Sequence, residues 1–188
     1  MQDTLPIHFA PLQGYTEAIY RNAHDAFFGG VDTYYTPFVR LEKGNFRRRD
    51  VRGIEPENNG VTHLIPQLIA SSAEKAEVIL SLFIEKGYQE VDINLGCPFP
   101  LLAKRHNGSG ILPYPEEVKA LLSIVTRYPQ ISFSVKMRLG WEQPDECLAL
   151  APILNDLPLR QITMHPRLGK QGYKGEVDLQ GFSAFREV

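Results

Sequence analysis

The sequence has 188 residues, 43% hydrophobic and 22% charged, with a formal net charge of −2, which is the composition of a folded domain and not of a disordered chain. No apolar stretch reaches the roughly 18 to 20 residues of a membrane span and the opening residues lack a secretory signal, so we expect a cytoplasmic protein with no membrane association. The balanced charge gives no overall basic character, so any nucleic acid contact must come from local clusters of positive residues.

Strands and helices are predicted to alternate along the chain. Short runs rich in apolar and β-branched residues predict six strands, at 6–12, 33–39, 63–69, 90–96, 132–138 and 161–166. Apolar residues at helical spacing predict helices at 16–28, 71–86, 115–128 and 144–154. The interval 41–60 is mostly polar without clear periodicity, so we expect a loop there. Repeated strand-helix units of this kind predict an α/β fold.

Residues at the predicted helix ends support these boundaries. Ser71 and Glu74 have the spacing of a capping box at the start of the second helix, and Gly87 suits the left-handed residue after its end. Pro115 suits the first turn of the third helix, where its missing N–H leaves no donor unsatisfied.

The architecture that best fits these units is a TIM (β/α)8-type barrel. A doubly wound sheet usually carries a G-x-G-x-x-G turn after its first strand, and residues 10–14 (APLQG) lack it. A complete barrel takes about 250 residues. We therefore expect residues 1–188 to form one incomplete barrel domain that stops before closure, with about six strand-helix units. The edges of the first and sixth strands would then be unpaired, which favours association unless another chain completes the sheet.

Polar side chains recur at the carboxyl ends of the predicted strands. In the strand at 90–96, the period of two places Asp92 and Asn94 on one face and apolar residues, which should meet helices, on the other. The residues expected to point inward at successive strand ends are Gln67, Asn94, Lys136 and His165, and Arg138 shares the face of Lys136. Each one alone is equally well explained as a solvated strand end or a satisfied polar group in the core. Together they predict a binding site at this end of the barrel.

The chemistry of these side chains suits a heterocyclic ligand. An inward lysine can stabilise negative charge that develops on a reduced ring. The amides of Gln67 and Asn94 can donate to and accept from the edge of a heterocycle. Such groups suit a flavin or a pyrimidine.

Several motifs along the chain closely resemble those of the tRNA-dihydrouridine synthase family in order and spacing. The three main ones are 10–16 (APLQGYT), 92–98 (DINLGCP) and 135–140 (VKMRLG). Further matches at 108–112 (GSGIL), 163–167 (TMHPR) and 171–175 (QGYKG) extend the resemblance over nearly the whole chain. A lone Gly-Cys-Pro is a weak indication, whereas this combination is specific.

The resemblance implies an FMN cofactor that lies across the strand ends. Pro11 and Leu12 would back its ring, and Gln67, Lys136 and His165 would contact it. Members of the family use NAD(P)H to reduce the flavin, which then passes hydride to C6 of an extruded uracil in tRNA. A base leaves its stack at a cost of a few kcal/mol in a paired region and less in a loop, so a uridine in a tRNA loop is a reasonable substrate.

The same resemblance assigns Cys97 as the acid that protonates C5 of the uracil and places Asn94 toward the substrate base or the ring. We also expect Arg138 on the substrate side. An unperturbed thiol, with a pKa of about 8.5, is protonated at neutral pH and suits this role. The alternative is an inert residue in the turn before Pro98. The other cysteine, Cys147, falls in a helical pattern and is expected to pack. The two cysteines lack metal-ligand spacing, so we expect reduced thiols and no metal site.

One dense basic stretch could contact phosphates beside the flipped base. Its cations, with Phe46 among them, are Arg40, Lys43, Arg47, Arg48, Arg49 and Arg52. A second, weaker group follows the cysteine loop and consists of Lys104, Arg105 and His106. Either group could equally be a solvated charged loop that makes no contact with RNA.

Other functions stay open at this point. The family's last two barrel strands, whose loops commonly hold the flavin phosphate, and its carboxy-terminal helical domain have no counterpart here. An FMN barrel acting on a free pyrimidine or a small enone would need the same residues. A lyase with a Schiff base on Lys136 and an inactive fragment are further alternatives, and the oligomeric state is not determined.

Overall fold

The computed structural model describes residues 5–188, and its strands form two parallel sheets. The first sheet contains β1 (His8–Phe9), β2 (Thr33–Tyr35) and β5 (Leu64–Ile65). The second contains β6 (Gln67–Leu68), β7 (Glu90–Leu95), β8 (Ser132–Gly140) and β9 (Leu159–Leu168). Only Pro66 separates β5 from β6, and it has no N–H to donate to a ladder. The segment 64–68 therefore pairs with β2 through β5 and with β7 through β6, and it joins the two sheets with all strands in chain order.

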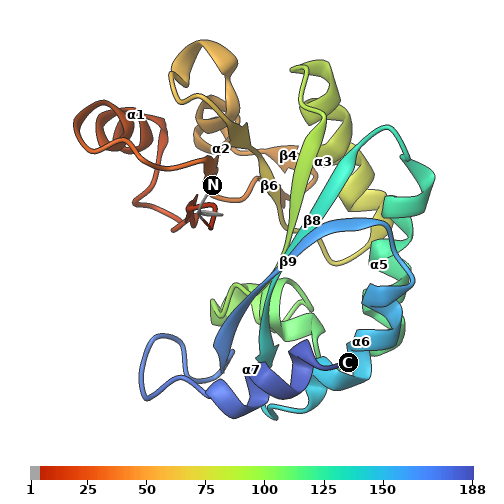
Figure 1. Cartoon of the computed structure of the whole chain (residues 1–188). Coiled ribbons are helices and arrows are strands. Elements are labelled where there is room, and N and C mark those ends of the chain that lie inside the picture. The colour runs from red at the N-terminus through yellow and green to blue at the C-terminus, as the bar shows by residue number, and fades with distance from the viewer. Residues whose placement is uncertain (1–4) are drawn as a thin grey trace.

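This order confirms an α/β fold built from parallel strands that succeed one another along the chain. Each of the six predicted strands is present, and the third is divided at Pro66 into β5 and β6. Parallel neighbours in chain order are also what a TIM barrel requires. Among residues 5–188 no ladder joins β1 to β9, so the sheet is open between these strands. Figure 1 shows β8 and β9 side by side within it.

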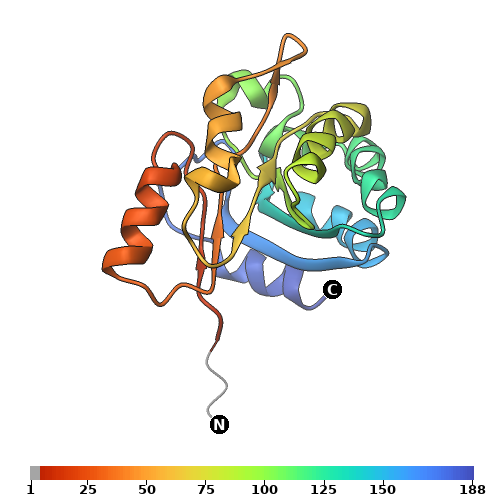
Figure 2. The same cartoon turned by 90° about the horizontal axis from the view of Figure 1, so that it is seen from above.

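Helices cover the outer face of the sheet. They are α1 (Ala18–Phe27), α3 (Ala73–Glu85), α5 (Pro115–Arg127), α6 (Glu146–Asn155) and α7 (Leu179–Arg186). Figure 2 shows α3, α5 and α6 along one side of the strands. The predicted apolar faces of the strands pack here, because Val91, Ile93 and Val135 share one buried cluster with Phe83 of α3 and Leu121 of α5. None of the described helices is long and apolar enough to cross a membrane.

Most helix-end predictions are confirmed, with one shift. Pro115 occupies the first turn of α5, and Gly87 has a φ of 84° just after α3. The capping prediction at Ser71 was wrong by one residue. Ser72 is the cap of α3, and its hydroxyl accepts from the backbone N–H of Lys75. Ser71 accepts instead from the Lys75 ammonium, at 2.9 Å.

The interval 41–60 is structured, so the prediction of a loop there was wrong. It contains the hairpin of β3 (Leu41–Glu42) and β4 (Asn45–Phe46), the helix α2 (Arg48–Ile54) and a 3-10 turn at Pro56–Asn58. Lys43 and Gly44 form the hairpin turn with φ values of 51° and 80°. These elements are too short for periodicity to reveal them. Two further short helices, α4 (Pro100–Ala103) and a 3-10 turn at Gly108–Ile111, follow the cysteine loop.

Candidate active site

A cavity of about 1050 Å³ opens at the carboxyl ends of the strands. The residues predicted for the site all line it, namely Pro11, Leu12, Gln67, Asn94, Cys97, Lys136, Arg138 and His165. They come from the loop after β1 and from β6, β7, β8 and β9, which lie next to one another because the strands are parallel and in chain order. The structure thus brings the predicted residues together, and their individual roles stay predictions.

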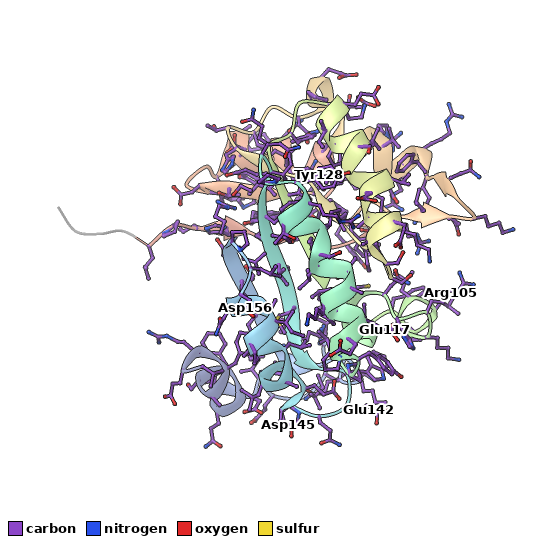
Figure 3. The ribbon with its side chains drawn as sticks, turned by 90° about the vertical axis from the view of Figure 1, so that its right-hand side faces the viewer. Arg105, Glu117, Tyr128, Glu142, Asp145 and Asp156 are labelled. Carbon is purple, nitrogen blue, oxygen red and sulfur yellow. The ribbon has the colours of Figure 1, made fainter. Side chains whose placement is uncertain are left out.

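The cavity is strongly positive although the chain as a whole is not. Its lining includes six cationic side chains, which are Arg40, Arg47, Lys136, Arg138, Lys170 and Lys174. Three of them pair with carboxylates beside the cavity: Arg40 and Arg47 with Glu42, at 3.8 and 3.7 Å, and Lys170 with Glu142, at 2.5 Å. Other exposed carboxylates lie away from the cavity, and Figure 3 shows Glu117, Asp145 and Asp156 along α5 and around α6 on the outer side of the sheet. The chain as a whole has a net charge of −2, but the cations gathered at the cavity favour an anionic ligand there.

Apolar and aromatic side chains form much of the remaining wall. They include Tyr15, Phe38, Phe99, Trp141 and Tyr173, together with Pro11, Leu12 and Pro98. Flat rings and prolines offer extended surfaces to a planar ligand. Positive groups combined with such walls suit a planar heterocycle that carries a phosphate.

The end of β7 is fixed by the side chain of Asn94. Its Oδ1 accepts hydrogen bonds from the backbone N–H groups of Gly96, at 3.0 Å, and Cys97, at 2.8 Å. Its Nδ2 donates to Oε1 of Gln67 at 2.7 Å. Both amides therefore bond first to the protein. Gln67 Nε2 donates in turn to Asp92 at 2.6 Å. An amide nitrogen carries two hydrogens, so each of the two amides keeps one N–H for a ligand.

The cysteine loop is held from its other side by the turn at Gly108–Ile111. The carbonyl of Cys97 accepts from the backbone N–H of Ser109, at 3.0 Å, and from its hydroxyl, at 2.9 Å. Gly108 has a φ of +60°, and a Cβ there would lie 2.6 Å from the Cys97 carbonyl oxygen. Only glycine fits this approach without strain.

The Cys97 thiol is free and partly buried where it lines the cavity. Burial raises its pKa above the ordinary value, and the charges of Arg138, Arg40 and Lys136 only partly oppose this rise. The group is therefore a protonated thiol at neutral pH. Cys147, in contrast, lies in the apolar core, and its thiol donates to the carbonyl of Pro144 at 3.2 Å.

Lys136 presents a cation to the cavity. Within the described part of the chain, its ammonium has no hydrogen-bond or ion-pair partner. Burial lowers its pKa, and the nearby charge of Asp92 opposes this effect. A desolvated cation without a partner gains most from an anionic ligand.

His165 is neutral in this environment. Its Nε2 lies 3.0 Å from Nη1 of Arg167, and because a guanidinium can only donate, Nε2 accepts and the ring proton is on Nδ1. Burial lowers the pKa of His165 to about 4, and the charges of Arg138, Lys136 and Arg167 add to this effect.

Arg138 has a structural connection that the sequence did not reveal. Its Nε donates to the carbonyl of Gly96 at 2.9 Å. Its Nη1 donates to the carbonyls of Leu168, at 2.9 Å, and Gly172, at 2.7 Å. The guanidinium, which also lies 5.5 Å from the ring centre of Tyr173, thus ties the cysteine loop to the loop after β9. Nη2 is left for the predicted contact with substrate.

Gln13 and Arg40 also line the cavity; Gln13 was not predicted as a site residue, and Arg40 was predicted only as a possible phosphate contact. The Oε1 of Gln13 and the Nε of Arg40 are buried, and neither has a hydrogen-bond partner in the described structure. Unpaired buried polar atoms are costly, so both are suited to bonding with a ligand. Their positions in the APLQGYT motif and the basic stretch were the available indications.

The two basic groups separate in the structure. From the stretch at 40–52, Arg40 and Arg47 reach the cavity, whereas Arg49 pairs with Glu17 on the surface. From the second group, His106 stacks on Tyr114 with ring centres 4.1 Å apart. It belongs to a separate cavity of about 520 Å³ and not to the main one. The predicted RNA contacts of both groups stay predictions.

Comparison with known proteins agrees with these features. The family model described as dihydrouridine synthase matches residues 8–187. The chain is 27% identical over 186 residues to a probable tRNA-dihydrouridine synthase 1 from Synechocystis sp., covering 95% of this chain and 50% of the relative. It is 30% identical over 122 residues to tRNA-dihydrouridine synthase B from Vibrio cholerae, covering 64% and 36%. The tRNA-dihydrouridine(16) synthase of Haemophilus ducreyi is 28% identical over 180 residues, covering 90% and 54%.

The chain therefore spans about half the length of the relatives that match most of it. The family model covers the whole of the described fold except its first residues and its last one. It includes the cysteine loop and every strand that contributes to the cavity. The chain belongs to the dihydrouridine synthase family.

Proposed function

We propose that this chain is the flavin-binding catalytic part of an enzyme that reduces a uridine in tRNA to 5,6-dihydrouridine. One observation carries the proposal: the partly buried Cys97 thiol and the unpartnered Lys136 ammonium line the same positive cavity. Family membership and the names of the relatives agree with it. We propose further that residues 1–188 form one domain and that its strands are part of a TIM barrel.

FMN fits the cavity by charge and by shape. Its phosphate would find six cations, which outnumber the two carboxylates that pair with them, Glu42 and Glu142, and its ring would find aromatic and proline walls. We assign Pro11 and Leu12 to the ring surface and Gln67, Lys136 and His165 to polar contacts with the cofactor. Gln13 and Arg40 add buried groups that lack partners. When bound and reduced by NAD(P)H, the flavin supplies the hydride.

Cys97 supplies the proton in this proposal. The reduction adds hydride at C6 of the uracil and a proton at C5, so an acid must hold a proton near the base. Burial raises the pKa of the Cys97 thiol, so the thiol keeps its proton at neutral pH and can donate it. Asn94 fixes the loop that carries this thiol and has one N–H left for the base. Arg138 is assigned to the substrate side through Nη2.

The tRNA would approach the mouth of the cavity. Only a base that has left its stack can reach the thiol, and the neighbouring phosphates then lie close to the protein. Arg47, Lys170 and Lys174 line the cavity and are placed to contact them.

The test uses the protein at its natural length with FMN, NADPH and tRNA transcribed without modifications. Mass spectrometry of the digested tRNA is expected to show dihydrouridine that depends on all three additions. Free uracil, dihydroorotate and a small enone serve as competing substrates. Turnover of one of these without any dihydrouridine in tRNA would contradict the proposal and favour a small-molecule oxidoreductase.

A further inference from the structure

Four buried polar side chains on β6, β7 and β8 form a continuous line of hydrogen bonds that leads to the cysteine loop. The strands bring them together because Gln67 pairs with Asp92, and Asp92 pairs with Ser134, in the parallel register. Ser134 Oγ donates to Oδ1 of Asp92 at 2.6 Å. Gln67 Nε2 donates to Oδ2 of Asp92 at 2.6 Å. All three side chains are almost completely buried.

The line continues from Gln67 to the backbone of Cys97. Gln67 Oε1 accepts from Asn94 Nδ2 at 2.7 Å. Asn94 Oδ1 then accepts from the N–H groups of Gly96, at 3.0 Å, and Cys97, at 2.8 Å. Each amide in the line can point either way, so its direction must be set by the groups at the two ends.

We propose that Asp92 is a positioning residue whose carboxylate sets the direction of this line and thereby holds Cys97 in place. The inference rests on the proposed function, in which Cys97 is the proton donor. A carboxylate only accepts, so Gln67 must turn its N–H toward Asp92 and its oxygen toward Asn94. Asn94 must then turn its own oxygen toward the cysteine loop. Asp92 does not line the cavity and acts through Gln67 and Asn94.

Replacing the carboxylate by an amide of the same shape removes this control. In Asp92→Asn, one arrangement keeps the line but turns the new N–H group toward Ser134, whose hydroxyl then loses its acceptor. The other arrangement keeps the bond from Ser134 and reverses both Gln67 and Asn94, which brings an N–H group of Asn94 against that of Cys97. In the first arrangement the new N–H group donates to Ser134 Oγ and only the hydroxyl hydrogen is left without an acceptor, whereas in the second two N–H groups face each other. We expect part of the population in the second arrangement, which has its mismatch at the cysteine loop.

A second substitution is expected to repair the first. In the double variant Asp92→Asn/Gln67→Glu, the new carboxylate at 67 accepts from the amide at 92 and from Asn94. Ser134 can still donate to the amide oxygen at 92. Asn94 again turns its oxygen toward Cys97, and no group is left without a partner.

The experiment measures the rate at which iodoacetamide alkylates Cys97, followed by mass spectrometry of its peptide in the natural-length protein. Asp92→Asn is expected to alkylate about three to ten times faster, the range for losing one buried hydrogen bond at the loop. The turnover number on tRNA is expected to fall in the same variant while the KM for tRNA stays within about twofold, because Asp92 does not touch the substrate. The double variant is expected to alkylate at the wild-type rate.

An unchanged alkylation rate in Asp92→Asn would overturn the proposal, and so would a double variant that alkylates as fast as the single one. If Asp92→Asn does not fold, the double variant decides, because it is expected to fold and to match the wild-type rate. Alkylation needs neither FMN nor tRNA. A wild-type protein without activity on tRNA but with the expected alkylation pattern would refute only the proposed function.

Discussion

The guanidinium of Arg138 donates a hydrogen bond of 2.9 Å to the carbonyl of Gly96, the residue before Cys97. Through Nη1 it also holds the carbonyls of Leu168 and Gly172. A single buried side chain on β8 thus connects the loops that follow β7 and β9. The loop after β9 is also held by its backbone, because the N–H groups of Gly169 and Lys170 donate to the carbonyls of Gly140 and Trp141. The hydrogen bond from Arg138 to Gly96 adds the connection to the loop after β7.

Arg138→Lys is expected to lower the free energy of unfolding by about 2 to 4 kcal/mol, because an ammonium cannot reach all three carbonyls and leaves buried acceptors unpaired. Urea unfolding measures the change. Arg49→Lys is the control, since Arg49 pairs with Glu17 at the surface and the change should stay within about 0.5 kcal/mol. Equal effects of the two substitutions would contradict the structural role of Arg138.

Gly108→Ala is expected to destabilise the protein by about 2 to 4 kcal/mol. It combines a strained backbone, at a φ of +60°, with a Cβ only 2.6 Å from the carbonyl oxygen of Cys97. Gly44→Ala separates the two causes, because Gly44 has a φ of +80° and open space around the new Cβ. Its cost should be about 1 kcal/mol in the same urea measurement. A Gly108 variant no less stable than the Gly44 variant would show that the close approach to Cys97 is relieved cheaply.

Cys97→Ala is expected to retain FMN and to lose dihydrouridine formation by a factor of about 100 or more, because the acid for C5 is removed. Flavin absorbance and mass spectrometry of the tRNA measure the two properties. Cys147→Ala is the matched control, since that thiol lies in the core, and it should keep its activity while losing about 1 kcal/mol of stability. Wild-type turnover in Cys97→Ala would exclude the assigned role.

Lys136→Met is expected to raise the Kd for FMN by about 10- to 100-fold, the range for losing one charged hydrogen bond. Quenching of flavin fluorescence measures the affinity. Lys104→Met removes the same charge from an exposed position outside the main cavity and should leave the Kd within about twofold. If both variants bind FMN equally well, Lys136 does not contact the cofactor.

His165 is expected to titrate near pH 4 in the ligand-free protein, because burial and three nearby cations lower its pKa to about 4. In the unfolded chain its pKa is about 6.5. Between these values the unfolded state binds more protons, so stability rises with pH across this window and is lost as the pH falls through it. NMR of the imidazole measures the midpoint. A value near 6.5 would mean that His165 is solvated and free of the cations.

Much of the site could be predicted from the sequence because strand periodicity is a local property. The period of two in β7 and β8 identified the face that carries Asn94, Lys136 and Arg138, and the parallel order of the strands brought those faces to one cavity. The DINLGCP motif identified the cysteine loop at the end of β7. These inferences needed only the residues of a single strand and its end.

The parts that could not be predicted depend on contacts between distant segments. Arg138 donates hydrogen bonds to the backbone carbonyls of Leu168 and Gly172. Every residue has a backbone carbonyl, so the sequence does not indicate which carbonyls accept these bonds. The hairpin and α2 within 41–60 are too short to show periodicity, and their place beside the cavity comes from tertiary packing. The positive charge of the cavity does not show in the net charge of the chain, because carboxylates elsewhere, such as Glu117 and Asp156 on the outer side (Figure 3), balance it.

The most direct test is a crystal structure of the natural-length protein saturated with FMN. We expect one isoalloxazine in the cavity at the carboxyl ends of the strands, with the Lys136 ammonium in hydrogen-bond contact with the ring and the Cys97 sulfur facing the space beside it. Density for FMN at any other place, or a Lys136 that points away from the flavin, would contradict it.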